Sequence, residues 1–109
     1  LINSMGPSGF EEETREVWRK RTEKFVDEVS TDVHGNAMGI LNKEGKPKVM
    51  LAGHLDEIGY MVKYVNKEGL LYFSPIGGVD LHLVPGERIW IKTKNGKILG
   101  VIGRKKKSR

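Results

Sequence analysis

The sequence contains no cysteine, which excludes disulfides and zinc–thiolate clusters and is consistent with a reducing, cytoplasmic environment. No apolar run approaches the roughly 20 residues that a membrane-spanning helix requires, so no membrane contact is expected. The first five residues, Leu1-Ile2-Asn3-Ser4-Met5, lack the charged region and long apolar stretch of a secretory signal peptide. They also lack an initiator methionine at position 1, so further residues are expected upstream.

Acidic residues are missing from the last six positions, 104–109, which hold five basic residues. The rest of the chain keeps 14 of the 19 basic residues against all 14 acidic ones, so its charges balance. A balanced body lacks the broad basic face typical of nucleic-acid-binding domains. We therefore expect 104–109 to be a solvated basic tail and expect no nucleic-acid partner. Non-specific attraction of phosphates to this tail is the weakest alternative.

The length of 109 residues and the hydrophobic content of 38% allow one domain, or parts of two, with a modest core. The first element is predicted to be a helix over about residues 9–24. It follows a turn signal at residues 6–9, and Ser8 and Glu11 have the spacing of a capping box. Its apolar positions recur at near-helical spacing: Phe10, Val17, Trp18 and Phe25.

Two short strands are predicted after the helix. Residues 29–33 alternate apolar and polar side chains, residues 34–36 form a turn, and residues 37–41 return as the second strand of a hairpin. After a loop at 42–47, the apolar run Val49–Gly53 has the composition of a strand covered on both faces. Such a strand belongs in the interior of an α/β sheet.

The chain after Asp56 has only strand and turn patterns. The predicted strands are 58–65, 70–73, 88–93 and 98–102, with a loop at 75–78. Asn95-Gly96 favours a type I′ turn between the last two strands. Because no helical pattern appears after residue 25, the change near residues 57–60 predicts a domain boundary.

His54 and Asp56 are the main candidates for chemistry because they follow the predicted strand Val49–Gly53. Open α/β sheets place their sites at the carboxyl ends of strands. An imidazole is a good ligand for zinc or cobalt, and a carboxylate two residues later can accept a hydrogen bond from the other ring nitrogen. The spacing is a weak signal by itself, and a structural role for both residues stays open.

Other polar residues have a structural interpretation beside a functional one. Glu57 is either a ligand or base, or a solvated strand end. Asp80 and His82 lie in a glycine-rich loop, which they could shape or bring toward a site, and His34 is expected at the surface of a turn. The sequence contains no serine or cysteine nucleophile in an elbow motif.

Four segments in this order, 6–11, 32–39, 48–59 and 73–80, resemble the start of the tetrahedral (TET) aminopeptidases of peptidase family M42. Relatives are also labelled cellulases, endoglucanases or deblocking aminopeptidases. The resemblance runs from about residue 5 to residue 103. It implies an α/β fold, with residues 1–58 as the N-terminal portion of a metallopeptidase catalytic domain. Residues 59–103 would be part of a β-rich, barrel-like dimerisation domain.

The resemblance also implies roles at the candidate site. His54 resembles the first ligand to one ion of a zinc or cobalt pair, and Asp56 resembles the carboxylate that orients this histidine. The remaining ligands and the catalytic glutamate of the family lie downstream of the residues present here. We therefore expect a truncated or fragmentary aminopeptidase that is inactive alone and does not hold the metal pair tightly.

The alternative is a non-catalytic interaction module derived from the same family. In that case residues 59–103 would mediate self-association into a homodimer or a larger homo-oligomer. Peptides would be the substrates only of the full-length relatives.

Overall fold

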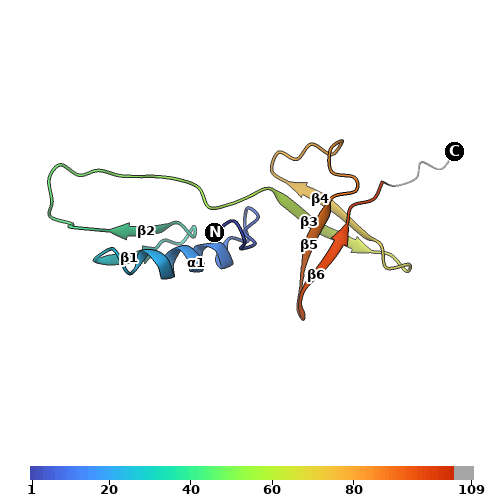
Figure 1. Ribbon diagram of the computed structural model, residues 1–109, viewed down its shortest axis with the longest axis horizontal. Coiled ribbons are helices and arrows are strands. Elements are labelled where there is room, and N and C mark those ends of the chain that lie inside the picture. Colours follow the sequence, from blue (N-terminus) through green and yellow to red (C-terminus); the bar gives the residue numbers. More distant parts are fainter. Residues whose placement is uncertain (105–109) are drawn as a thin grey trace. The chain divides into compact units, whose positions relative to one another are not determined.

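The computed structural model describes residues 1–104, so the predicted tail beyond Arg104 lies outside the described residues. The described residues form a mostly-β structure with one helix and three antiparallel hairpins (Figure 1). The chain divides into two compact units, Leu1–Gly78 and a second that begins at Val79. The predicted domain boundary at residues 58/59 stays a prediction. The elements are α1 Glu12–Thr22, β1 Glu28–Thr31, β2 Ala37–Ile40, β3 Gly59–Val65, β4 Leu71–Ile76, β5 Arg88–Thr93 and β6 Gly96–Val101.

Helix α1 begins later than predicted because the capping box does not form. Glu11 occupies the N-cap without a side-chain capping bond, and its carboxylate accepts a hydrogen bond from the Gly9 backbone N–H instead (2.6 Å). The Ser8 hydroxyl is engaged by Asp56. The helix keeps favourable charges at both ends, with acidic residues in its first turn and three basic residues in its last turn.

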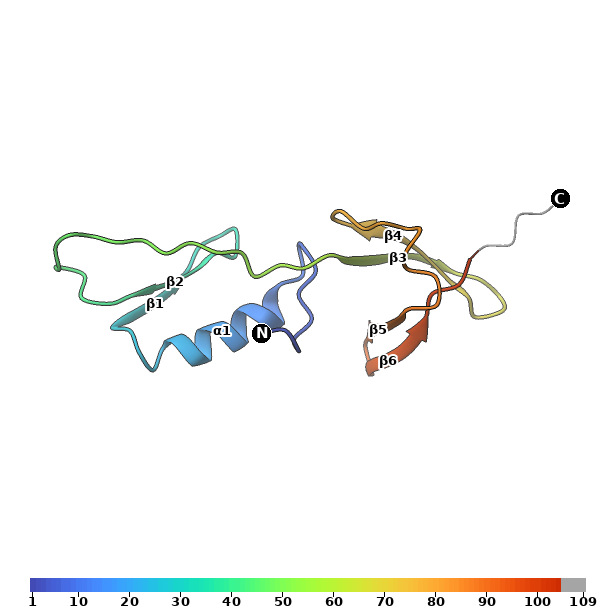
Figure 2. The ribbon, with the colours of Figure 1, turned by 45° about the horizontal axis from the view of Figure 1, so that its top comes forward.

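Strands β1 and β2 pair as predicted, and α1 lies alongside β2 (Figure 2). The turn between them is organised by Asp32. Its carboxylate accepts hydrogen bonds from the backbone N–H groups of His34 and Asn36 (both 2.9 Å) and from the Asn36 side-chain amide (2.8 Å). His34 is exposed in this turn, as expected. The predicted strand ends early, at Thr31, because Asp32 begins the turn.

The prediction of a strand over Val49–Gly53 is wrong, because this segment forms no strand within the described residues. The segment between β2 and β3 is extended but belongs to no sheet (Figure 1). Val49, Met50 and Leu51 are 80%, 87% and 95% exposed. A strand covered on both faces needs neighbouring strands for its backbone groups, and residues 1–104 supply none beside it.

Strands β3 and β4 form the second hairpin, which aromatic pairs reinforce across the strands. Tyr60 meets Phe73 edge-on and Tyr64 stacks on Tyr72, with ring centroids 4.7 Å and 4.9 Å apart. Strand β4 extends to Ile76, so the predicted loop begins only at Gly77. Pro75 is tolerated within β4 because each strand of a two-stranded sheet is an edge strand.

The third hairpin, β5–β6, forms as predicted, but its turn is not of type I′. That turn requires a positive φ at both central residues. Thr93 pairs with Gly96, so the central residues are Lys94 and Asn95, and neither has a positive φ, whereas Gly96 has one (119°). The Thr93 hydroxyl stabilises the turn from within. It donates a hydrogen bond to the Gly96 carbonyl (2.7 Å) and accepts one from the Asn95 N–H (3.2 Å).

The described residues bury few apolar side chains, so the modest core that composition allows does not form within residues 1–104. Ile102 is the one buried hydrophobic residue among them, and Thr14 is the buried polar one. Large apolar side chains on the strands, such as Trp90 at 60%, stay exposed. The hairpins therefore depend on their own hydrogen bonds and turns. Within the described part of the chain, no helix has the length and apolar character needed to cross a membrane.

We expect the β1–β2 turn to loosen in acid. Hydrogen bonds from the side chain and backbone of Asn36 hold the pKa of Asp32 below its ordinary value. Such a carboxylate stabilises the fold above its unfolded pKa of about 3.9, and the contribution is lost as pH falls through the lower folded pKa. In an NMR titration, the Asn36 amide should stay constant above about pH 5 and change below about pH 4.

The control for this titration is Asp32→Asn, which removes the ionisable group. The acid-induced change of the Asn36 amide should disappear in this variant. An identical titration of that amide in both proteins would show that Asp32 does not control the turn.

Candidate metal-ligand site

The predicted hydrogen bond between His54 and Asp56 is present. His54 Nδ1 lies 3.0 Å from Asp56 Oδ1 and 3.1 Å from the Asp56 backbone oxygen. Both neighbours are acceptors, so the geometry places a proton on Nδ1, which in the neutral ring is the Nδ1–H tautomer. The His54 side chain is 87% exposed. This tautomer leaves the Nε2 lone pair available to a metal ion.

Ser8 holds the second oxygen of the Asp56 carboxylate. The Ser8 hydroxyl donates a hydrogen bond to Oδ2, whereas His54 takes Oδ1. The pKa of Asp56 is lowered, first by the hydrogen bond from Ser8 and then by that from His54. The carboxyl group is therefore ionised at neutral pH and can accept from both donors.

The N-terminal loop that carries Ser8 is tied to Glu57 in both directions. The Gly6 N–H donates to Glu57 Oε1 (3.0 Å), and the Glu57 N–H donates to the Gly6 carbonyl (2.9 Å). Pro7 forms a parallel bridge with Glu57. The Glu57 carboxylate is thus engaged by the loop, which favours a structural role over that of a ligand or base.

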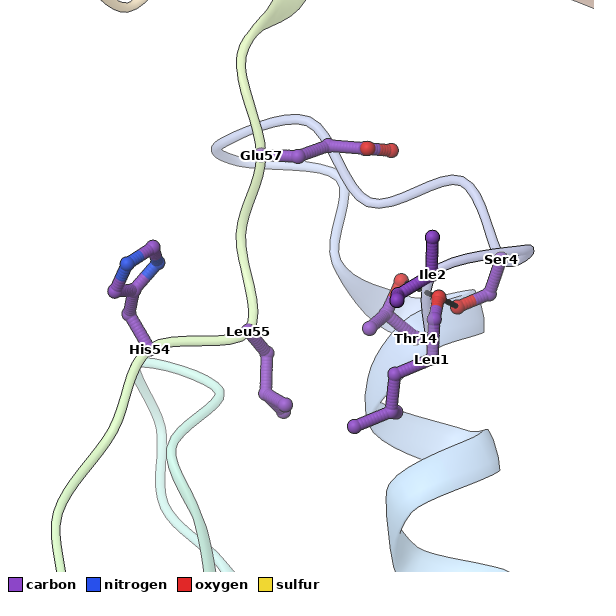
Figure 3. A pocket seen from close by; sticks show the side chains of 7 residues that line it. All are labelled: Leu1, Ile2, Ser4, Thr14, His54, Leu55 and Glu57. Atoms are coloured by element: carbon purple, nitrogen blue, oxygen red, sulfur yellow. Dashed lines mark hydrogen bonds between the residues drawn. The ribbon is translucent and has the colours of Figure 1, made fainter.

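An open pocket of about 230 Å³ lies beside this loop (Figure 3). His54 and Leu55 project to different sides of the extended segment, as alternate residues of extended backbone do. Aliphatic and hydroxyl groups dominate the wall, and His54 and Glu57 are its titratable side chains. The lining residues are Leu1, Ile2, Ser4, Thr14, His54, Leu55 and Glu57.

The other predicted candidates have local structural roles. The Asp80 carboxylate accepts a hydrogen bond from the His82 N–H (2.9 Å), which shapes the loop of the second unit. Both residues are exposed. The functional interpretation of this pair stays a prediction. The structure thus brings together Ser8, His54 and Asp56.

Sequence reasoning did not assign Ser8 to the site. The spacing of Ser8 and Glu11 favoured a helix cap, which is a local role, whereas its partner Asp56 lies 48 positions away. The turn signal at residues 6–9 marked the loop but carried no information about what the loop would contact.

Comparison with known proteins places the chain in a family. Residues 35–108 match the model of the family described as M42 glutamyl aminopeptidase. The chain belongs to this family. It is 38% identical, over 104 residues, to the lysyl aminopeptidase of Pyrococcus furiosus, a match that covers 94% of this chain and 30% of the relative.

Two solved structures are similar to the chain. A TET aminopeptidase from a marine sediment archaeon of the Thaumarchaeota matches with a TM-score of 0.88 and 35% identity. That match covers 95% of this chain and 29% of the archaeal protein. A structure described as an endoglucanase from Thermotoga maritima matches with a TM-score of 0.81 and 33% identity, over 93% of this chain and 32% of that one.

The chain therefore spans about 30% of the length of the relatives that it matches. The M42 family uses metal ions. Within residues 1–104, no group of three or more histidine, aspartate or glutamate side chains could hold such an ion. His54 and Asp56 fit the roles of one metal ligand and the carboxylate that orients it. A catalytic zinc usually has three protein ligands.

The loop should detach when Gly59 gains a side chain. A Cβ atom at this position would lie 2.7 Å from Pro7 Cβ, a contact that requires the loop to move. Overpacking costs about 1–3 kcal/mol, so Gly59→Ala should lower the hydrogen-exchange protection of the Glu57 amide. The matched control is Gly53→Ala, because a Cβ atom there meets nothing within 4 Å. Equal protection in both variants would contradict the packing of the loop against Gly59.

Proposed function

We propose that this chain is part of a metal-dependent aminopeptidase, in which His54 is one metal ligand and Asp56 orients it. The observation that carries the proposal is the bond between His54 Nδ1 and Asp56 Oδ1 at 3.0 Å. It favours the tautomer whose Nε2 can bind a metal ion such as zinc or cobalt. Family membership supports the same reading.

The residues of this chain supply the orientation of one ligand. Asp56 accepts the Nδ1 proton, which keeps Nε2 unprotonated, and the exposure of the ring leaves room for an ion beside it. When bound, a metal pair would polarise the carbonyl of an N-terminal peptide bond and lower the pKa of a bound water. The proton acceptor for that water, and the other ligands, would come from residues beyond this chain.

We expect the 109-residue chain to be inactive by itself. Hydrolysis of a panel of aminoacyl chromogenic substrates, with zinc or cobalt added, should not exceed that of His54→Ala. One imidazole provides too few donors to hold an ion tightly. Metal-dependent hydrolysis that is lost in His54→Ala would contradict this expectation, because the missing ligands would then come from a second copy or from other residues of the chain.

The second candidate function is an interaction module that self-associates through the hairpins of residues 59–103. The observation that favours it is the exposure of large apolar side chains on β5 and β6. Contiguous exposed apolar surface commonly marks an interaction site. Trp90 pairs with Leu99, and Val101 follows two residues later, so these three side chains share one face of the hairpin. They are between 53% and 68% exposed.

Light scattering across a concentration series tests self-association. The mass should rise from that of one chain toward two, and Trp90→Lys should reduce the dimer fraction because a charge in a buried apolar contact is unfavourable. Lys94→Ala, in the exposed turn outside both strands, is the control and should leave the dimer fraction unchanged. A monomeric mass at every concentration would exclude a dimer.

A further inference from the structure

The Asp56 carboxylate divides its two oxygens between two donors from distant parts of the sequence. Oδ1 takes the His54 ring, two residues away, and Oδ2 takes the Ser8 hydroxyl, 48 residues away. The Asp56 backbone oxygen is a second acceptor beside His54 Nδ1, at 3.1 Å. An ionised carboxylate only accepts hydrogen bonds, so the Ser8 hydroxyl is the donor. Two donors on different oxygens fix the rotation of the carboxyl group, whereas one donor would leave it free to swing.

The loop around Ser8 is held independently of that hydroxyl. The Gly6 N–H donates to the Glu57 carboxylate, and the Glu57 N–H donates to the Gly6 carbonyl. Pro7 packs against Gly59. Gly9 has a positive φ of 87°, which turns the chain directly after Ser8. The hydroxyl is thus delivered to Asp56 by a preformed turn, and this limits the entropy lost when the bond forms.

Partial burial protects the bond between Ser8 and Asp56 from water. Both side chains are half-buried, whereas the His54 ring is 87% exposed. Water competes strongly for Asp56 on the His54 side and less on the Ser8 side. The Ser8 bond is therefore the more durable anchor of the carboxylate.

We infer that Ser8 is a positioning residue: its hydroxyl anchors Asp56 so that His54 keeps its proton on Nδ1 and presents Nε2 to a metal ion. The inference rests on the proposed function of His54 as a ligand. Ser8 acts through Asp56 and itself touches neither the imidazole nor an ion. Its removal should therefore change the state of the ring before it changes any reaction.

The tautomer of His54 is the direct test. Long-range ¹⁵N–¹H NMR of the 109-residue chain at about pH 8.5, where histidine is neutral, separates Nδ1–H from Nε2–H. The unchanged protein should show mainly Nδ1–H at His54. Ser8→Ala should shift the ring toward Nε2–H, as Asp56→Asn should, and Ser8→Thr should restore Nδ1–H because it restores a hydroxyl.

The matched control is Ser30→Ala, in β1, which should leave the His54 tautomer unchanged. His34 and His82 are internal references in every spectrum. An Nδ1–H fraction at His54 that is the same in Ser8→Ala as in the unchanged protein would overturn the inference.

The Glu57 amide shows whether Ser8→Ala has merely released the loop. Protection of this amide from exchange should be retained, because its acceptor is the Gly6 carbonyl. If the loop is released, Ser8→Cys replaces Ser8→Ala, since a thiol fills similar space but is a weak donor. With the loop docked, Ser8→Cys should still shift the tautomer, and an unshifted ring would overturn the inference.

Titration with zinc, followed by the His54 ring signals, separates failure of this inference from failure of the proposed function. Ser8→Ala should weaken zinc binding at His54 by about tenfold, the lower end of the 10–100-fold range for partners of metal ligands. If Ser8→Ala binds zinc at His54 as the unchanged protein does, the inference fails and the proposed function stands. Because one imidazole binds zinc only weakly, the titration runs to a large excess of zinc. If that excess leaves the His54 signals unaffected in the unchanged protein, the proposed ligand role of His54 fails, and the positioning of a metal ligand fails with it.

Discussion

The pair of hydrogen bonds between Gly6 and Glu57 is the constraint on which the candidate site depends. It joins positions 51 residues apart and lays the N-terminal turn against the extended segment before β3. Apolar packing contributes little there, because the buried residues described in the first unit are Gly6 and Thr14, and neither has a large apolar side chain. A few directional hydrogen bonds, rather than a core, therefore hold Ser8, Asp56 and His54 in their relative positions.

Features that depend on near neighbours were predictable from the sequence. The three hairpins followed from alternating patterns and turn residues, and the bond between His54 and Asp56 followed from a spacing of two on extended backbone. Ser8 was not predictable because two roles competed for one hydroxyl. A neutral cap to a backbone N–H lost to a charge-assisted bond with Asp56, and such bonds are roughly twice as strong.

The segment Val49–Gly53 shows why the rest could not be predicted. Its composition is that of a strand buried on both faces, but composition does not say which residues would flank it. Residues 1–104 leave it unpaired and exposed. The relatives are roughly three times as long as the matching part. The apolar faces of the hairpins are exposed in the same way.

In the proposed site, the orientation of a ligand is separate from the binding of a metal. Orientation needs one carboxylate with a donor on each oxygen, and Ser8 and His54 provide those donors without deep burial. Affinity instead needs several donor atoms around one ion, and these are not gathered among residues 1–104. Under this proposal, a short segment would hold the imidazole in its binding tautomer before any ion arrives. In a longer protein, ligands from other segments would then meet a histidine that has little orientational freedom left to lose.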